Sequence, residues 1–98
     1  MGAVLQLAEW VGEMKVSEAI LRGFEKVNGN QIRYTFFEHD RHGRVVGCCV
    51  MGAASLGGAG GQRFGRPFRE AWGIHPTALN DRGMPWEHIY GMAVAAGL

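Results

Sequence analysis

The chain has 98 residues, enough for one small domain and too few for a two-domain enzyme or a complete dinucleotide-binding fold. Hydrophobic residues make up 47% and charged residues 19%, an ordinary globular composition that argues against a disordered chain. Ten basic and nine acidic side chains give a formal charge of +1, which excludes a strongly basic nucleic-acid-binding coat and an acidic tail. Glycine is the outlier, with 16 residues.

Two helices are expected at the start of the chain. In residues 1–13, apolar side chains recur at helical spacing and predict an amphipathic extension ahead of the main domain; they are Val4, Leu7, Ala8 and Val11. Residues 14–98 are then expected to form a single small globular domain. Within it, Ser17 is a candidate N-cap for a helix of about three turns. The apolar stripe of that helix comprises Val16, Ile20, Leu21 and Phe24.

A β-hairpin is expected next. Residues Ile32–Phe37 are rich in β-branched and aromatic side chains, which favours a strand. Residues 40–43 supply a turn in which Gly43 can adopt a positive φ, and residues 44–46 return as a second strand. A lone hairpin must rest on an apolar surface, so we expect it to lie against the helices.

The uncharged segment 48–56 predicts a short buried helix that Gly57 or Gly58 ends in the left-handed conformation. Its small residues would let neighbouring backbones approach closely; they are Gly52, Ala53 and Ala54. A glycine-rich loop is expected over residues 57–65.

The last third of the chain predicts two more helices. Pro67 suits the first turn of a helix that reaches Trp72 and stops at Gly73. Residues 74–81 are expected to be irregular or a single turn. Pro85 then opens the final helix, whose inner stripe is Trp86, Ile89, Tyr90 and Ala93. The fold class is therefore α+β, with four or five short helices packed around one β-hairpin.

The two cysteines, Cys48 and Cys49, are adjacent and cannot staple distant segments, which indicates free thiols in a reducing compartment. Their place at a predicted helix start suggests one chemistry: a thiol nucleophile with His39, His42 or His75 as base and Asn80 or Asp81 orienting it. The spacing does not select one histidine, although His75 is a candidate. The simpler interpretation, which we favour, is that both thiols fill a small-residue core.

Metal and phosphate sites are not indicated. The sequence has no C-x-x-C and no H-x₃₋₅-H pair, and His39 and His42 match neither zinc template. The interval from Gly52 to Gly57 matches a phosphate-binding loop, but Gly58 stands where that loop requires lysine. We therefore expect neither a metal nor a cofactor.

Arg63, Arg66 and Arg69 recur every three residues beside Phe64 and Phe68. Arginines interleaved with aromatic side chains can hold phosphates and stack bases, so a weak nucleic-acid-binding surface is one alternative. A solvated helix face is the more ordinary interpretation, and acidic side chains spread along the chain oppose a positive field.

Three separated motifs resemble one pattern. They are Ser17-Glu18-Ala19-Ile20, Cys49-Val50-Met51-Gly52-Ala53-Ala54, and Leu79-Asn80-Asp81 followed by Trp86-Glu87-His88-Ile89. Residues 14–97 thereby resemble a family of small uncharacterised bacterial and phage proteins. That family carries a Ser-Glu-Ala-Ile helix, a Cys-Ala-Leu-Gly-Ala-Ala helix, a Leu-Asn-Asp motif and a closing Trp-Thr-Arg-Glu-Gln-Ile-Ala helix. Val50, Met51 and the segment 84–86 depart from it. The resemblance implies a phage or mobile-element setting and no activity.

The sequence as a whole favours a small non-enzymatic protein that binds an unidentified protein partner; one version is inhibition of a host enzyme or defence system. Large side chains that anchor interfaces when exposed support this, so the partner-binding candidates are Arg63, Phe64, Arg66, Phe68, Arg69 and Trp86. We also expect self-association through the 1–13 stripe, because small cores gain from it. No signal peptide or membrane span is indicated, which predicts a cytoplasmic location, in the host if phage-encoded.

Overall fold

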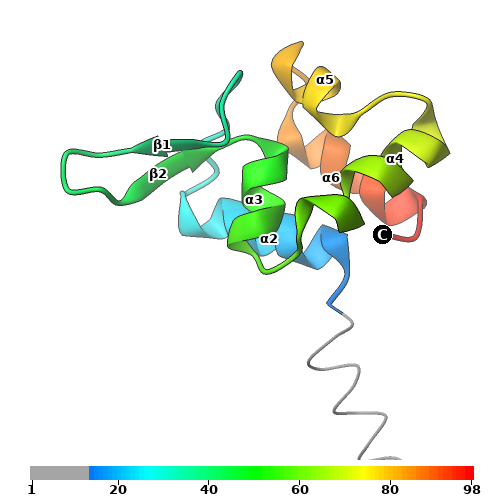
Figure 1. The fold of residues 1–98 in the computed structure, drawn as a ribbon, viewed down its shortest axis with the longest axis horizontal. Coiled ribbons are helices and arrows are strands. Elements are labelled where there is room, and N and C mark those ends of the chain that lie inside the picture. The colour runs from blue at the N-terminus through cyan, green and yellow to red at the C-terminus, as the bar shows by residue number, and fades with distance from the viewer. Residues whose placement is uncertain (1–13) are drawn as a thin grey trace, which may run out of the picture.

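The computed structural model describes residues 14–98, and the predicted helix in residues 1–13 lies outside them. Within this range the α+β prediction is confirmed, with five α-helices, one 3₁₀ turn and one two-stranded antiparallel hairpin. Figure 1 shows the hairpin projecting from one side of the helices. The elements are α2 (Val16–Lys26), β1 (Phe37–His39), β2 (Val45–Cys48), α3 (Val50–Leu56), η1 (Gly61–Arg63), α4 (Gly65–Trp72), α5 (Pro76–Asp81) and α6 (Trp86–Ala95).

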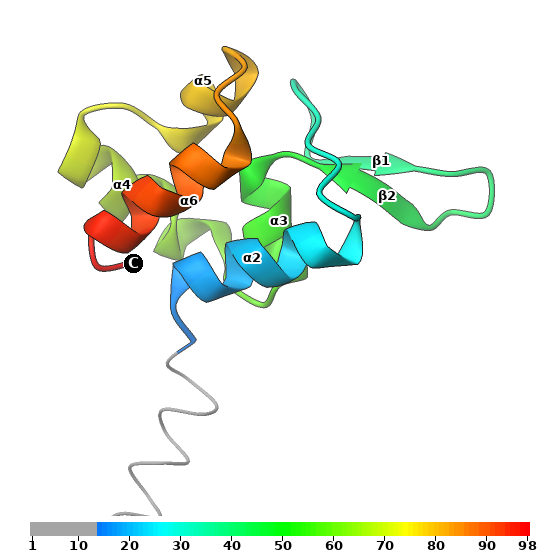
Figure 2. The same cartoon turned by 180° about the vertical axis from the view of Figure 1, so that it is seen from behind.

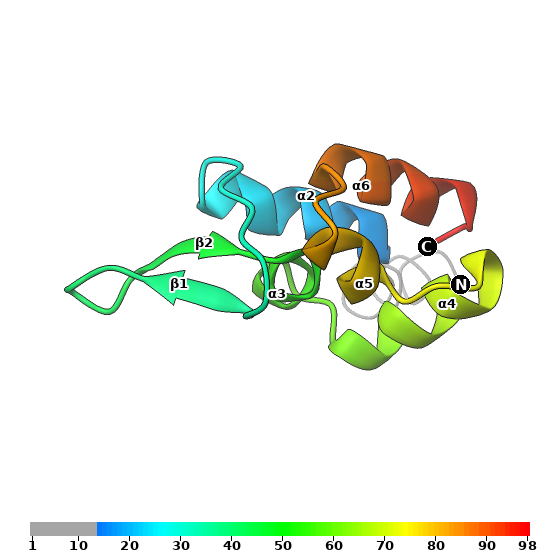
Figure 3. The ribbon, with the colours of Figure 1, turned by 90° about the horizontal axis from the view of Figure 1, so that it is seen from above.

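The close crossing of α2 and α3 forms the centre of the molecule. A Cβ on Gly23 of α2 would overlap the carbonyl oxygen of Ala53, and one on Gly57 would overlap that of Ala19. The predicted close approach at Gly52 is also present, because a Cβ there would meet the carbonyl oxygen of Phe36. Figure 2 shows α2 running across α3, and Figure 3 shows α2 and α6 on one side of α3 with α4 on the other.

Aromatic side chains fill the space between these helices. Phe24 stacks on Trp86 with ring centroids 4.6 Å apart. Phe64 and Phe68 meet edge to face at 5.6 Å, and both are fully buried. Trp72, at the end of α4, stays part-exposed and donates its indole N–H to the carbonyl oxygen of Met92 at 3.0 Å. The helical part therefore has one continuous core.

The strand predicted over residues 32–37 is wrong. Strand β1 begins only at Phe37 and pairs with β2 in the register Phe37↔Cys48, with a bulge after Glu38. Residues 33–36 are bends, and Tyr34 has a φ of 70°. The reason is competition for the backbone groups, since the carbonyl of Ile32 and the N–H of Tyr34 bond to side chains of α5 instead of to a strand.

Several predicted helix ends shift. Lys15 is the N-cap of α2, and Ser17 lies buried in its first turn. Pro85 is the N-cap of α6 rather than its first residue. Residues 76–81, expected to be irregular or one turn, form helix α5.

Other boundaries follow the sequence closely. Helix α4 starts at Gly65, two residues before the predicted start, and stops at left-handed Gly73 as predicted. Gly58, with a φ of 106°, supplies the positive φ after α3, and Gly43 supplies the one in the hairpin turn. No helix in residues 14–98 has the length and apolar character needed to cross a membrane.

Candidate functional site

A buried asparagine connects the base of the hairpin to the helices. The side chain of Asn80, on α5, is 0% exposed. Its Oδ1 accepts hydrogen bonds from the Val50 N–H at 3.0 Å and from Gln31 Nε2 at 2.9 Å. Its Nδ2 donates to the carbonyl oxygen of Ile32 at 2.8 Å. One amide side chain therefore fixes the start of α3 and the segment that precedes the hairpin.

Gln31 extends this network to the last helix. Its Nε2 also donates to the carbonyl oxygen of Met84 at 3.0 Å, and its Oε1 accepts the backbone N–H of Trp86 at 2.7 Å. That N–H is one of the groups that a helix start leaves without an internal partner. Gln31 thus caps α6 from a residue 55 positions earlier in the chain. Segment 31–36 rises beside α5 in Figures 1 and 2.

The neighbouring Asp81 shapes the exposed part of the same segment. Its Oδ1 accepts the N–H of Tyr34 at 2.9 Å and a longer bond of 3.4 Å from Asn80 Nδ2. This arrangement holds Tyr34 in its left-handed conformation, which non-glycine residues rarely adopt. As a result, Tyr34 is 78% exposed and Phe36 is 54% exposed. We call these two side chains the aromatic lip.

A small pocket lies at the aromatic lip. Its volume is about 100 Å³, and it is lined by Tyr34, Thr35, Phe36, Cys49, Thr77 and Asp81. These residues come from the loop before β1, the N-cap of α3 and helix α5. A larger pocket of about 340 Å³ lies beside the start of α2 and the end of the chain, and it is lined by Met14, Lys15, Val16, Arg63, Gly97 and Leu98. The smaller pocket is the candidate site, because exposed aromatic side chains and a carboxylate meet there.

Neither thiol lies in an environment that would make it a reactive nucleophile. Cys49 is 2% exposed, and its Sγ accepts the Gly52 N–H at 3.4 Å as the N-cap of α3. Burial raises the pKa of both thiols, that of Cys48 to about 12, and the negative charge of Asp81 also raises the pKa of Cys49. A reactive thiol needs the opposite environment, one that is exposed and electropositive.

The histidines that could act as a base are not hydrogen-bonded to either cysteine sulfur in residues 14–98. His75 Nδ1 accepts the N–H of Thr77 at 3.1 Å as the N-cap of α5, and its ring packs against Gly65. His39 and His42 are exposed on the hairpin. Among residues 14–98 neither thiol is hydrogen-bonded to a histidine. The predicted Cys-His-Asn arrangement is thus not assembled there.

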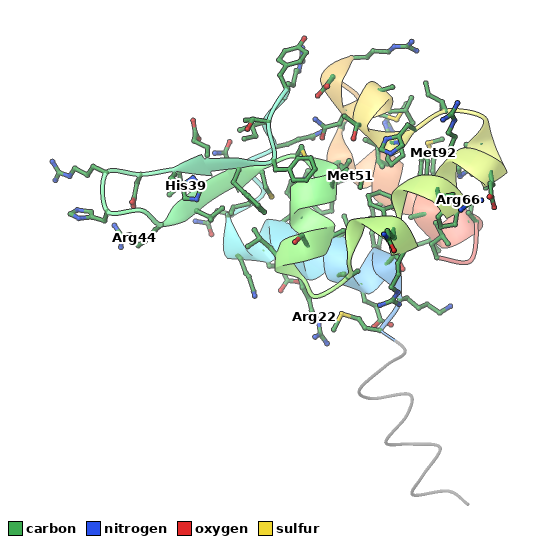
Figure 4. The ribbon with its side chains drawn as sticks, in the orientation of Figure 1. Arg22, His39, Arg44, Met51, Arg66 and Met92 are labelled. Carbon is green, nitrogen blue, oxygen red and sulfur yellow. The ribbon has the colours of Figure 1, made fainter. Side chains whose placement is uncertain are left out.

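The predicted partner-binding residues are not brought together on one surface. Phe64 and Phe68 are fully buried in the core, so neither can contact a partner. Trp86 is half-buried against Phe24. Figure 4 shows His39 and Arg44 on the hairpin, with Arg66 on the far side of the molecule.

The three arginines are also not equivalent. The Arg63 guanidinium donates to the carbonyl oxygen of Met14. Arg66 forms an exposed ion pair with Glu70 at 3.4 Å. Arg69 is exposed on α4. One arginine is therefore engaged with the backbone and another with a carboxylate, which leaves no uniform row of free cations.

In the part of the chain that the structure describes, no three His, Cys, Asp or Glu side chains gather closely enough to hold a metal ion.

The sequence pointed to some residues of this site and missed others. The sequence suggests Asn80 and Asp81 as groups that orient a histidine base, whereas their side chains order the segment before the hairpin. Gln31, Tyr34 and Phe36 were not singled out. The only available signal was the aromatic run after Asn28-Gly29-Asn30, which favours a strand equally well.

Comparisons with models of known protein families, with curated proteins and with solved structures give no match for this chain.

Proposed function

We propose that the protein is a non-enzymatic binding module that holds a segment of a partner protein at the aromatic lip. The observation that supports this most is the exposure of Tyr34 and Phe36 on a backbone fixed by Asn80 and Asp81. Tyrosine is enriched among the side chains that dominate binding energy, and an anchor already held in place loses little entropy on binding. Tyr34 and Phe36 are not part of the buried core, so their side chains are available for recognition.

The hairpin edge beside the lip supports binding of an extended segment. Strand β2 has β1 on one side and a bridge from Gln31 to Cys48 on the other. Among residues 14–98, no strand lies along the outer edge of β1. An open edge can accept one more strand through main-chain hydrogen bonds, while neighbouring pockets select its side chains.

Selection from a displayed peptide library tests this function without knowledge of the partner. We expect peptides to be enriched on the wild-type protein and to bind the Tyr34→Ala/Phe36→Ala variant about thirtyfold more weakly or worse, because hot-spot truncation costs about 2 kcal/mol or more. Val94→Ala is the matched control, since Val94 is 51% exposed on α6, away from the lip. Equal binding to wild type and the double variant would reject the proposal.

The phage or mobile-element setting and the inhibition of a host enzyme or defence system stay predictions of the sequence resemblance. Thiol catalysis and nucleic-acid binding gain no support from the contacts of Cys49 and Arg63. Self-association through residues 1–13 also stays a prediction.

A further inference from the structure

We infer that the pocket at the aromatic lip receives a lysine side chain of the bound segment, with the ammonium group next to Asp81. This inference rests on the proposed function and names the chemistry that the site selects. It is carried by a carboxylate that forms no ion pair within residues 14–98, two exposed aromatic rings and a cavity of side-chain size, all within one pocket.

The carboxylate of Asp81 has no cationic partner in residues 14–98. The ion pairs there join Arg44 to Asp40 and Arg66 to Glu70, and no lysine, arginine or histidine nitrogen lies within 4 Å of Asp81. Oδ1 of Asp81 accepts the N–H of Tyr34, whereas Oδ2 accepts no hydrogen bond from these residues. Asp81, a lining residue of the pocket, therefore keeps one carboxylate oxygen that can accept a further hydrogen bond.

The use of Oδ1 by the backbone decides between lysine and arginine. Guanidinium groups bind carboxylates best through two parallel hydrogen bonds, which need both oxygens. Because Oδ1 already accepts hydrogen bonds from the Tyr34 N–H and from Asn80 Nδ2, a single-point donor such as an ammonium group fits better.

The remaining walls suit the rest of a lysine side chain. The rings of Tyr34 and Phe36 can lie against the four-carbon stem and can attract the cation through their faces. Cys49 and Thr77 contribute small side chains. A volume of about 100 Å³ exceeds the roughly 30 Å³ of one water and falls short of the roughly 300 Å³ at which pockets hold whole small molecules. The pocket thus matches one side chain.

Three small probes separate charge from shape. They are the N-acetyl methylamides of lysine, norleucine and Nε-acetyl-lysine, titrated into the full chain while NMR follows the amide signals of Tyr34 and Thr77. We expect the lysine probe to shift both signals and to bind about three- to tenfold more tightly than the norleucine probe. This ratio combines one partly screened ion pair with one cation–π contact.

Asp81→Asn is the decisive variant, because its amide oxygen can still accept the Tyr34 N–H while the charge is removed. We expect it to lose most of the preference for the lysine probe over the norleucine probe and to keep only the part that the cation–π contact contributes. Glu25→Gln is the matched control, since it removes an exposed carboxylate on α2 and should keep the lysine preference. An unchanged Phe36 amide signal in the free Asp81→Asn protein would show that the lip is intact, whereas the Tyr34 signal itself shifts because its acceptor loses a charge.

The remaining outcomes distinguish failure of the lysine inference from failure of the proposed binding function. If norleucine binds wild type as tightly as lysine, or if no probe binds while library peptides still depend on Tyr34 and Phe36, the lysine inference is wrong and the binding function stands. If the lysine probe binds through Asp81 but library peptides do not depend on the lip, the proposed function is wrong and the cation site stands.

Discussion

The two adjacent thiols occupy different positions in the fold, yet both are unreactive for the same reason. Cys49 borders the pocket at the lip and caps α3 with its sulfur, whereas Cys48 ends β2 and is fully buried. Among residues 14–98 no positive side chain lowers the pKa of either thiol, and burial is the largest cause of the raised pKa in each case. The protein therefore uses both residues as small apolar side chains.

The raised pKa of Cys48 makes stability depend on alkaline pH. The thiol has an ordinary pKa of 9.0, close to the value expected when unfolded, and a pKa of about 12 in the folded protein. Between these values the unfolded chain loses a proton that the folded one keeps. The contribution of the protonated Cys48 thiol to the free energy of unfolding is therefore complete below about pH 9 and is lost as pH rises toward 12.

Urea unfolding across that range measures the effect. Lysine and tyrosine side chains titrate there too, so the comparison is between wild type and Cys48→Ala. We expect the free energy of unfolding to fall less steeply with pH in the variant. Parallel slopes would mean that the buried thiol does not contribute.

At the residue scale the sequence pointed to chemically distinctive side chains but not to their partners. Asn80 and Asp81 belong to the site, yet they bind Ile32 and Tyr34 rather than a histidine. Those pairs lie 48 and 47 positions apart. Periodicity is a local signal, so it cannot reveal that distant side chains will take over backbone groups that a strand would need.

At the scale of elements, the approach of α2 to α3 depends on glycine. Gly23 lies inside α2, where glycine is normally less favourable than alanine by about 1 kcal/mol. The structure supplies the reason for its presence, because the backbone of Ala53 occupies the space that a Cβ would need. Gly91, inside α6, has no such neighbour within 4 Å.

The same substitution should therefore have opposite effects in the two helices. We expect Gly23→Ala to destabilise the protein by about 1–3 kcal/mol, since α2 and α3 must separate. Gly91→Ala should stabilise it by about 0.5–1 kcal/mol through helix propensity alone. Urea denaturation of both variants checks this, and a neutral Gly23→Ala would show that the crossing is wider than described.

Helix ends at glycine were more predictable than helix starts. The stripe of α6 and the left-handed stop of α4 at Gly73 could both be predicted from residue spacing and glycine placement. The start of α2 could not, because Ser17 is a good N-cap by residue type. Its backbone N–H is instead bonded to the carbonyl oxygen of Leu98, at the other end of the sequence. Caps satisfied by distant backbone leave no local signal.

At the scale of the whole molecule, the hairpin and the helices are joined by Asn80 and Gln31. Asn80 contacts the segment before β1 and the start of α3, and Gln31 continues to the start of α6. The segment is also held by the Asp81 bond to Tyr34 and by backbone bonds from Ile32 to Cys48 and from Cys49 to Phe36. The Asn80–Gln31 network adds the side-chain connection from this segment to the starts of α3 and α6, so we expect it to couple the unfolding of the hairpin to that of the helices.

Asn80→Ala tests this coupling. The change leaves the Val50 N–H and the Ile32 carbonyl without their partners, so we expect a loss of about 2–6 kcal/mol at roughly 1–3 kcal/mol for each unsatisfied buried group. Gln62→Ala, at an exposed amide in η1, should change stability by less than about 0.5 kcal/mol.

Native-state hydrogen exchange shows where in the molecule the Asn80→Ala variant opens. Amides of Ile32 and Trp86 should lose protection beyond the global decrease, because they open with the segment before the hairpin, whereas Ala53 in the α2–α3 crossing should report only global unfolding. An equal loss of protection at all three amides would show that the hairpin is not separately tethered, and that the aromatic lip owes its position to the fold as a whole.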